Sequence, residues 1–243
     1  MARQGRHRMN IVILTGAGIS AESGLGTFRD EDGLWTRYRI EDVATPEAYA
    51  RNPALVHELS NQLRREIRTA KPNEAHLALA RMEREHIGNF LLVTQNVDDL
   101  HQRAGSRNVL LMHGEIESAR CIDCGHTWRA PDEMSVEDYC PNCGTSRVRP
   151  DLVWFGEDVR FFDQIIVATE KADLFALIGT SGNVHPAAGL MELARESGAA
   201  TVEINLEPSA VASAADSVIL GRATEVVPLW VNETLTNAVR LRR

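Results

Sequence analysis

Four cysteines in one window of the chain have the spacing of a metal site. They form two C-x2-C pairs separated by 15 residues, Cys121 with Cys124 and Cys140 with Cys143. This spacing is typical of a zinc ribbon, and a glycine directly follows each pair, where a tight turn lets backbone amides face the thiolates. Four thiolates fill a tetrahedral zinc sphere and leave no position for an activated water. The sequence therefore predicts one zinc ion with a structural role.

Glycines and polar residues follow five short apolar runs that have the composition of β-strands. In a parallel sheet, ligands bind at the carboxyl ends of the strands, so these groups are expected to meet at one edge. Each group alone could be a turn or a helix cap. Five groups rich in glycines, hydroxyls, amides and carboxylates instead indicate a dinucleotide site: Gly16-Ala17-Gly18, Gln95-Asn96-Val97-Asp98, His113-Gly114, Gly179-Thr180-Ser181 and Asn205-Leu206-Glu207.

His113 is the candidate general base of this site. It directly follows a predicted strand, and Gly114 beside it would allow a substrate to approach closely. An ordinary imidazole pKa of about 6.5 suits proton transfer at neutral pH. His101, three residues past Asp98 at an expected helix start, is interpreted as structural, and His76 as a packed or capping residue.

The first glycine group does not predict a hydride-transferring dehydrogenase. Its G-A-G-x-S pattern departs from G-x-G-x-x-G, and the following region at 28–35 has no preceding strand that would carry the usual acidic residue. The run at 11–14 followed by the glycine turn does predict a phosphate cradle, with a helix that could begin at Ser20.

The elements that must position these residues alternate between strands and helices. This order predicts an α/β fold, a Rossmann-like doubly wound parallel sheet, with a small zinc-ribbon and helical domain inserted. The expected strands are 11–14, 89–94, 108–112, 152–157 returning to the sheet, 173–178, 201–204 and 217–220. The expected helices begin at a Thr45 cap, at Pro53 and at an Asn73 cap, and later cover 187–196 and 224–239.

Composition excludes several classes of protein. The 243 residues are 44% hydrophobic and 25% charged, as expected for a globular chain with a buried core. The formal net charge of −8 argues against broad binding to nucleic acid or to an anionic membrane. No apolar run reaches the 18 residues of a membrane span, and the early apolar run is too short for a signal peptide. A cytoplasmic protein is expected, in which disulfides are disfavoured.

Together these motifs resemble the sirtuin family of NAD-dependent protein lysine deacylases. The resemblance runs over about residues 10–231, and it is carried by GAGISAESGLGTFR, DGLW, TQNVDDLH, HGE, the two CxxC pairs, WFGE, GTSG and NLEPS. It is strongest toward the bacterial and mitochondrial branch that includes desuccinylases. The resemblance implies that NAD is consumed and that nicotinamide, O-acyl-ADP-ribose and free lysine are produced. It also implies acyl-lysine proteins or peptides as substrates, and we expect a monomer.

The resemblance assigns roles to particular residues. His113 would be the catalytic base, and Asn96 a second catalytic residue beside nicotinamide. The residues expected to contact NAD are Gly16, Ala17, Gly18, Ser20, Glu22, Thr27, Phe28, Arg29, Trp35, Gln95, Asn96, Val97, Asp98, Gly179, Thr180, Ser181, Asn205, Leu206, Glu207 and Ala223. Phe28 and Arg29 would belong to a flexible loop over the cofactor. The residues expected to contact the substrate are Ser60, Leu63, Val153, Trp154, Phe155, Gly156 and Glu157, the last five as an added strand beside the peptide.

The order of the expected strands and helices, with the zinc module inserted between two strands, also divides the chain into two domains. Residues 9–30, 72–117 and 150–243 would form the discontinuous NAD-binding Rossmann-like domain. Residues 31–71 and 118–149 would form the small helical and zinc-binding domain, and residues 1–8 a flexible tail.

One departure from the desuccinylase branch bears on acyl preference. That branch has a tyrosine and an arginine three residues apart that bind an acidic acyl group, and Ser60 and Leu63 align with them. Arg64 lies about 100° around the helix from Leu63 and should not substitute. A buried acyl carboxylate would lack a partner, so acetyl or longer apolar acyl groups are expected over succinyl.

Two other functions remain open at this point. A mono-ADP-ribosyltransferase could use the same NAD site. A nucleic-acid-binding zinc ribbon is less favoured, because the window 120–149 contains both arginines and acidic residues and is not basic.

Overall fold

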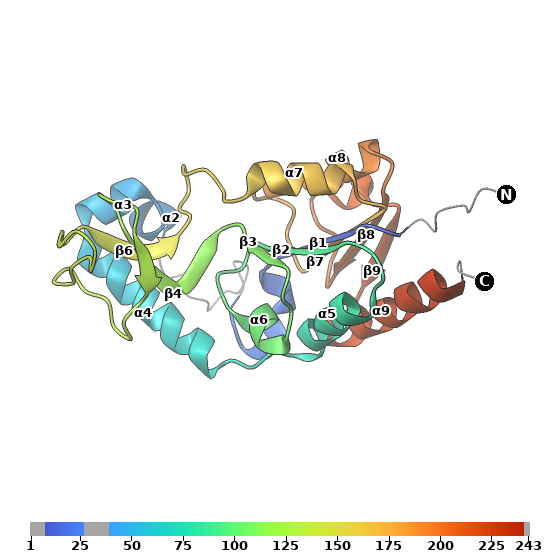
Figure 1. Cartoon of the computed structure of the whole chain (residues 1–243), viewed down its shortest axis with the longest axis horizontal. Coiled ribbons are helices and arrows are strands. Elements are labelled where there is room, and N and C mark those ends of the chain that lie inside the picture. The colour runs from blue at the N-terminus through green and yellow to red at the C-terminus, as the bar shows by residue number, and fades with distance from the viewer. Residues whose placement is uncertain (1–7, 27–38, 241–243) are drawn as a thin grey trace.

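The computed structural model describes residues 8–26 and 39–240. It has two sheets at different ends of an elongated molecule (Figure 1), as the sequence predicted for a main domain and a smaller insert. The strands of the six-stranded sheet are β1 (Ile11–Thr15), β2 (Phe90–Thr94), β3 (Val109–Leu111), β7 (Leu174–Ile178), β8 (Ala200–Asn205) and β9 (Ser217–Leu220). The strands of the three-stranded sheet are β4 (Gly114–Cys121), β5 (Thr127–Arg129) and β6 (Val148–Leu152).

The six-stranded sheet has the order β3-β2-β1-β7-β8-β9, and all of its neighbouring strands are parallel. Ile11 in β1 pairs with Phe90 on one side and Leu174 on the other, so these three strands start level. Their carboxyl ends are therefore also level, at Thr15, Thr94 and Ile178. The strand order reverses between β1 and β7, where sheets of this kind form a ligand-binding crevice.

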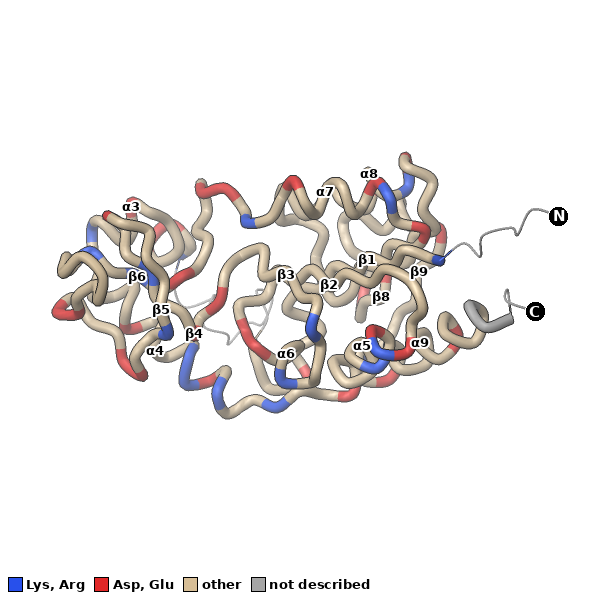
Figure 2. Tube along the Cα trace, viewed as in Figure 1, with Lys and Arg blue, Asp and Glu red and all other residues tan. Residues whose placement is uncertain are grey.

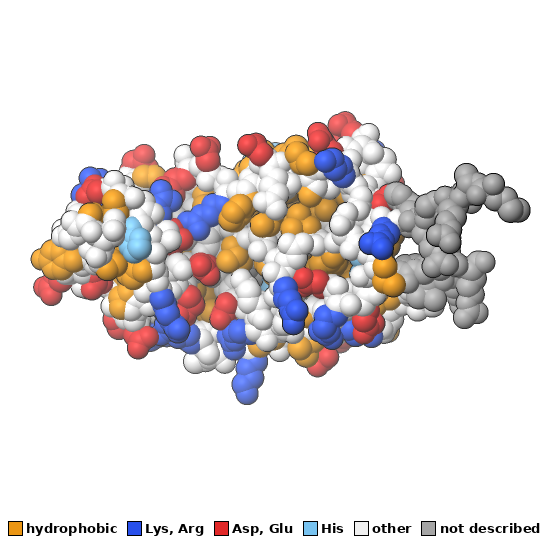
Figure 3. Space-filling view, viewed as in Figure 1, with side chains coloured by type: hydrophobic (Ala, Val, Ile, Leu, Met, Phe, Trp, Pro, Cys, Tyr) orange, Lys and Arg blue, Asp and Glu red, His pale blue; other side chains and the backbone are white. Residues whose placement is uncertain are grey.

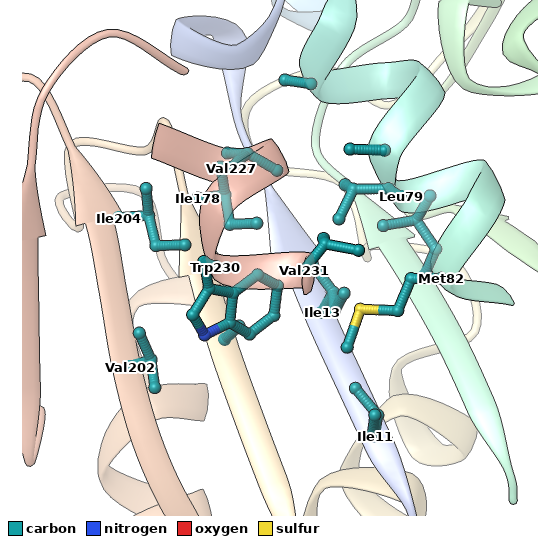
Figure 4. Close-up of a cluster of buried hydrophobic side chains, with 14 of the residues drawn as sticks. Ile11, Ile13, Leu79, Met82, Ile178, Val202, Ile204, Val227, Trp230 and Val231 are labelled. Atoms are coloured by element: carbon teal, nitrogen blue, oxygen red, sulfur yellow. The ribbon is translucent and has the colours of Figure 1, made fainter. Parts of the chain in front are cut away.

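Helices cover both faces of this sheet, which confirms the predicted doubly wound fold. On one face, Ile11 and Ile13 pack with side chains of α5 (Glu74–Glu85) and α9 (Ala223–Arg240), among them Met82 and Trp230 (Figure 4). On the other face, Val12 and the rest of its cluster pack with α7 (Phe162–Glu170) and α8 (Leu190–Glu196). Since both faces are covered, β1 is buried along its whole length.

The smaller sheet packs beside α2 (Ile40–Val43), α3 (Pro46–Arg51) and α4 (Pro53–Thr69) (Figure 1). β4 pairs antiparallel with β5 and β6. The expected return of 152–157 to the main sheet is wrong. Leu152 ends β6 opposite Gly114 of β4, and 153–157 form a turn. The run is apolar because it faces a cavity between the sheets, which periodicity alone does not distinguish from a buried strand.

The helix starts follow the predicted caps. Thr45 accepts the amide of Ala48 at the start of α3, and Asn73 accepts two amides at the start of α5. His76 accepts the Asn73 amide in return, which completes a capping box and confirms its predicted structural role. Asn52 caps α4 in the same way.

The remaining short elements are α6 (Leu100–Ala104) and the 3-10 turns η1 (Ala17–Ile19), η2 (Ala21–Ser23), η3 (Ala187–Gly189) and η4 (Ala212–Ala214). Acidic and basic residues both occur in each part of the molecule (Figure 2), and both signs are interspersed over the face in Figure 3. Among the described residues, no helix combines the length and apolar character that crossing a bilayer requires.

Candidate active site

A cavity of about 730 Å³ lies at the carboxyl ends of β1, β2, β7 and β8 and extends to α4 and the turn after β6. Its size is in the range of cofactor and substrate sites. All of the predicted NAD and substrate residues that lie within the described ranges line it, from Gly16 to Ala223. The predicted residues Thr27, Phe28, Arg29 and Trp35 lie outside the described residues.

The glycine turn is dictated by contact between two loops. A Cβ atom on Gly16 would lie 2.7 Å from the Thr180 Cβ, and one on Gly18 would lie 2.8 Å from the Gly179 Cα. The Gly18 amide donates to the Gly179 carbonyl at 2.7 Å. Only glycine lets the loops after β1 and β7 approach this closely.

The helix expected to begin at Ser20 is absent from the described residues that follow it. The chain makes the two 3-10 turns η1 and η2, and Gly24 ends the second in a left-handed conformation with φ 87°. Each turn lasts three residues, so backbone amides near the glycine turn come from short turns and not from a long helix.

Ser20, Asn96 and Asp98 form a buried polar network. The Ser20 hydroxyl donates to Asp98 Oδ2 at 2.9 Å, and Asn96 Nδ2 donates to Ser20 Oγ and to the Gly16 carbonyl at 3.2 Å each. Asp98 also accepts the Leu100 amide at 3.0 Å. Burial raises the pKa of Asp98, while these donated hydrogen bonds act in the opposite direction. The network holds an amide and a carboxylate at the cavity surface.

His113 Nδ1 lies 2.9 Å from the Gln95 backbone carbonyl. A carbonyl only accepts, so Nδ1 carries the proton and Nε2 of the neutral ring has a free lone pair. Burial lowers the pKa of His113 below 6.5, although the Gln95 carbonyl opposes this. The Gln95 side chain in turn donates to Thr180 Oγ1 at 3.0 Å, which connects the base to the β7 loop. His113 is therefore a neutral imidazole at neutral pH, able to accept a proton.

Gly114 is required for a reason other than substrate approach. Its φ is +81°, and an added Cβ would lie 2.1 Å from the Asp151 carbonyl oxygen of β6. The close neighbour is this chain's own backbone. Gly114 therefore fixes the start of β4 against β6, directly beside the base.

His101 has a structural position, as predicted. It is buried, its Nε2 lies 3.0 Å from Thr15 Oγ1, and its ring contacts that of His76 with centroids 4.8 Å apart. Burial holds the pKa of His101 well below 6.5. It does not line the cavity.

The loops after β7 and β8 form the other end of the cavity. Asn205 Nδ2 donates to the Thr180 carbonyl at 2.7 Å, which joins the two loops. Glu22 also lines the cavity, but its carboxylate accepts the amide and the hydroxyl of Thr224 at 2.9 Å each, at the start of α9. Through these two hydrogen bonds, Glu22 links η2 to the start of α9.

The cavity has an apolar branch between α4 and the turn after β6. Ser60 and Leu63 line it, and the Ser60 hydroxyl donates to the Val56 carbonyl of its own helix at 2.7 Å. The sequence does not predict most of this wall, because the spacing of its α4 residues is the same as that of a core-facing stripe. The unpredicted α4 residues are Val56, Leu59, Ile67 and the acidic Glu66, and the unpredicted residues from other elements are Leu25, Val43, Ala44 and Leu152.

Arg64 is directed away from this branch. It is fully buried, with Nε donating to the Ile116 carbonyl at 3.0 Å and one terminal nitrogen donating to Asn61 Oδ1 at 2.8 Å. Among residues 8–26 and 39–240, no Lys or Arg lines the apolar branch; the arginine that lines the cavity, Arg222, lies beside Glu22.

The turn at 153–157 already uses most of its amides. Those of Val153 and Phe155 donate to the His113 and Ala44 carbonyls at 2.8 and 2.9 Å, and those of Trp154 and Glu157 bond within the turn. The N–H groups of a peptide placed beside this segment would therefore have to donate mainly to the carbonyl oxygens of the segment.

The four cysteines converge on one point. Their sulfur atoms all lie within 4.8 Å of one another, with 3.6 Å between Cys121 and Cys143 and 3.7 Å between Cys124 and Cys140. A tetrahedron of thiolates around zinc at about 2.3 Å has sulfur atoms about 3.8 Å apart. The geometry therefore fits one zinc ion with four thiolate ligands.

This chain is similar to known proteins of one family. The sequence pattern of the Sir2 family matches residues 16–186. An NAD-dependent protein deacylase from Caulobacter vibrioides is 52% identical over 231 residues, which cover 93% of this chain and 97% of that relative. A crystal structure of a Sir2 homolog–NAD complex has a TM-score of 0.86 at 40% identity, covering 94% of this chain and 90% of the other. A Sir2 structure with a deacetylated p53 peptide and 3'-O-acetyl ADP ribose has a TM-score of 0.81 at 29% identity, with 94% of each chain covered. On these matches, the chain belongs to the Sir2 family.

Proposed function

We propose that this chain is an NAD-dependent protein-lysine deacylase, which releases nicotinamide and free lysine and transfers the acyl group to ADP-ribose. Relatives at about half sequence identity over most of the chain are NAD-dependent protein deacylases. The observation that carries the proposal is the orientation of His113, whose Nδ1 donates to the Gln95 carbonyl and leaves Nε2 as a base at the cavity.

The residues at the strand ends fit a bound NAD molecule. Asn96 and Asp98 offer an amide and a carboxylate, groups that hydrogen-bond a carboxamide such as that of nicotinamide. The loops after β1 and β7 lie at the cavity where phosphates would bind, although the Gly16 and Gly18 amides are already donated to the Ile178 and Gly179 carbonyls, and Asn205 and Glu207 offer polar groups to a ribose. Bound NAD supplies the ribose carbon to which the acyl oxygen bonds as nicotinamide leaves.

In this proposal, His113 Nε2 takes a proton from a ribose hydroxyl. Burial favours this role, because it keeps the ring neutral at neutral pH. Asn96 holds the carboxamide, and the zinc ion has no part in the chemistry because its four thiolates complete its coordination.

The acyl group is proposed to be acetyl or a longer apolar chain. The apolar branch presents Val56, Leu59 and Leu63, and the Ser60 hydroxyl hydrogen is already used by its own helix. A succinyl carboxylate placed there would lose water without gaining a cation among the described lining residues, and an unpaired buried charge costs more than the ~2–7 kcal/mol of an unpaired neutral polar group.

The decisive experiment is mass spectrometry of a reaction containing NAD and an acetyl-lysine peptide, with wild type compared with His113→Tyr. Nicotinamide and O-acetyl-ADP-ribose should form together, and only in the wild type. The alternative, a mono-ADP-ribosyltransferase, predicts that labelled ADP-ribose stays on protein without deacylation. A competition among acetyl, decanoyl and succinyl peptides tests the acyl class, and a clear preference for succinyl would contradict it.

A further inference from the structure

Arg149 is a buried cation beside the cavity. It lies on β6, it is 4% exposed, and it does not line the cavity itself. Its guanidinium donates to both oxygens of Glu157, at 2.6 and 2.8 Å, and to the Leu152 carbonyl at 2.6 Å. A two-point contact of this kind fixes the direction of the carboxylate as well as its distance.

The same guanidinium lies against Trp154, with its central carbon 3.3 Å from the ring centroid. Trp154 is 5% exposed and forms one side of the apolar branch together with Val43 and Leu59. A planar cation over an indole face is a favourable contact, and it is stronger where water is excluded. Arg149 therefore contacts two residues of the 153–157 turn that line the cavity.

Glu157 also accepts the Trp154 amide at 2.9 Å. Burial acts to raise the pKa of Glu157, but the hydrogen bonds from Arg149 and the Trp154 amide outweigh it, and the pKa lies below 4.5. The carboxylate is therefore charged at neutral pH, and it links the cation, the turn and the indole into one unit.

Resting on the function proposed above, we infer that Arg149 is a positioning residue for the acyl-lysine substrate: it sets the place of Trp154 and of the 153–157 turn without touching the substrate. This assigns a specificity role to a side chain behind the cavity. Loss of Arg149 should allow the indole and the turn to move, so the acyl-peptide would bind more weakly. NAD binding should change little, because none of the Arg149 contacts reaches the loops after β1, β7 or β8.

The matched control is Arg68 on α4. It makes an equivalent two-point contact with Glu117, at 2.8 Å from each oxygen, and also contacts Asp132. This pair joins α4 to β4 in the same part of the molecule but does not line the cavity. Arg68→Gln should therefore lower the unfolding temperature without changing the Michaelis constant for the peptide.

The experiment compares wild type, Arg149→Lys, Arg149→Met and Arg68→Gln with an acetyl-lysine peptide. We expect KM for the peptide to rise about tenfold or more in Arg149→Met and less in Arg149→Lys, which keeps the charge but not the planar fork. KM for NAD, and kcat at saturating peptide, should stay within about twofold. Peptide binding measured by fluorescence anisotropy without NAD should weaken by the same factor.

Zinc content and circular dichroism establish that each variant is folded. If Arg149→Met does not fold, Arg149→Lys carries the test, because it keeps the charge but removes the two-point contact. A variant that unfolds at a lower temperature but keeps the wild-type KM and peptide affinity would overturn the inference and leave Arg149 with a structural role only. An inactive wild type would instead refute the proposed function, while anisotropy would still report on Arg149.

Discussion

His113 and Gln95 are joined by a hydrogen bond that involves only the backbone of Gln95, from Nδ1 to the carbonyl oxygen at 2.9 Å. The tautomer of the base is therefore set by the path of the chain after β2. Substitution of the Gln95 side chain would remove its contact with Thr180 but would leave this hydrogen bond in place.

Deacylation should lose activity in acid with an apparent pKa below 6.5. Burial lowers the pKa of His113, so the ring becomes protonated, and inactive as a base, only below its ordinary value. The measurement is kcat/KM for nicotinamide release across the range from pH 5 to pH 8, about 1.5 units on each side of that value. A loss of activity that sets in above pH 7 would contradict this assignment of the base.

An arginine placed in the apolar branch should shift acyl preference toward succinyl. Leu63→Arg adds the missing cation, and a hydrogen bond to a charged group contributes about 1.5–3 kcal/mol, or roughly a 10- to 100-fold rise in kcat/KM for succinyl peptide. Decanoyl activity should fall. Gln62→Arg is the control, because it adds the same charge to α4 outside the cavity lining. An equal gain from both variants would show that the effect is long-range and not a contact in the branch.

Removal of zinc should weaken acyl-peptide binding before NAD binding. Asn61 on α4 exchanges two hydrogen bonds with the Met134 backbone, at 2.8 and 2.9 Å. Without the metal the segment around Met134 loses its support, and α4 with it. Titration with a chelator, followed by peptide anisotropy and circular dichroism, measures this, and added zinc should restore binding. Unchanged peptide affinity in the zinc-free protein would contradict the prediction.

Gly114→Ala should be much more destabilising than Gly198→Ala. Both glycines have positive φ, at +81° and +91°, but an added Cβ meets the Asp151 oxygen at 2.1 Å only in the first case. A non-glycine residue in the left-handed backbone region costs about 1–2 kcal/mol of stability, which is the loss expected for Gly198→Ala. Gly114→Ala should lose about 4 kcal/mol or more in urea unfolding, since backbone must move. Similar losses for the two variants would mean that β6 adjusts freely.

The folded protein should lose stability as the pH falls from about 7 toward 5. Burial lowers the pKa values of His57 and His113, lowers that of His76 to about 4, and holds that of His101 well below 6.5. The unfolded chain then binds more protons than the folded one below pH 6.5, so the free energy of unfolding decreases as the pH is lowered. Urea unfolding at several pH values measures the slope. A constant or increasing stability toward pH 5.5 would contradict this.

Most of the site was predictable because parallel strands end together. The sequence has polar groups directly after its apolar runs, and the register of β1, β2 and β7 brings those groups to one edge. The zinc site followed from spacing, and the caps at Thr45 and Asn73 from local hydrogen-bonding chemistry. These features depend on neighbours along the chain or on one rule of topology.

Features that depend on contacts between distant segments were not predictable. The stripe of Val56 and Leu59 has the pattern of a core helix, and only the fold shows that it faces a cavity. The need for glycine at 114 comes from β6, which lies far along the chain. The role of Arg149 was not predictable either, because its partner Glu157 becomes a neighbour only through the turn after β6.

Strand β4 begins at Gly114, the residue after the base, and ends at Cys121, the first metal ligand. The pairing of β4 with β6 already contains a register shift between Gly114 and Ala119, so a further inserted or deleted residue within β4 would change the faces that the residues beyond it present. Length changes between homologues should therefore be excluded from 114–121 and confined to the segments between the cysteine pairs. For protein engineering, the zinc ribbon of this chain can be exchanged for another only if the eight residues from Gly114 to Cys121 are kept.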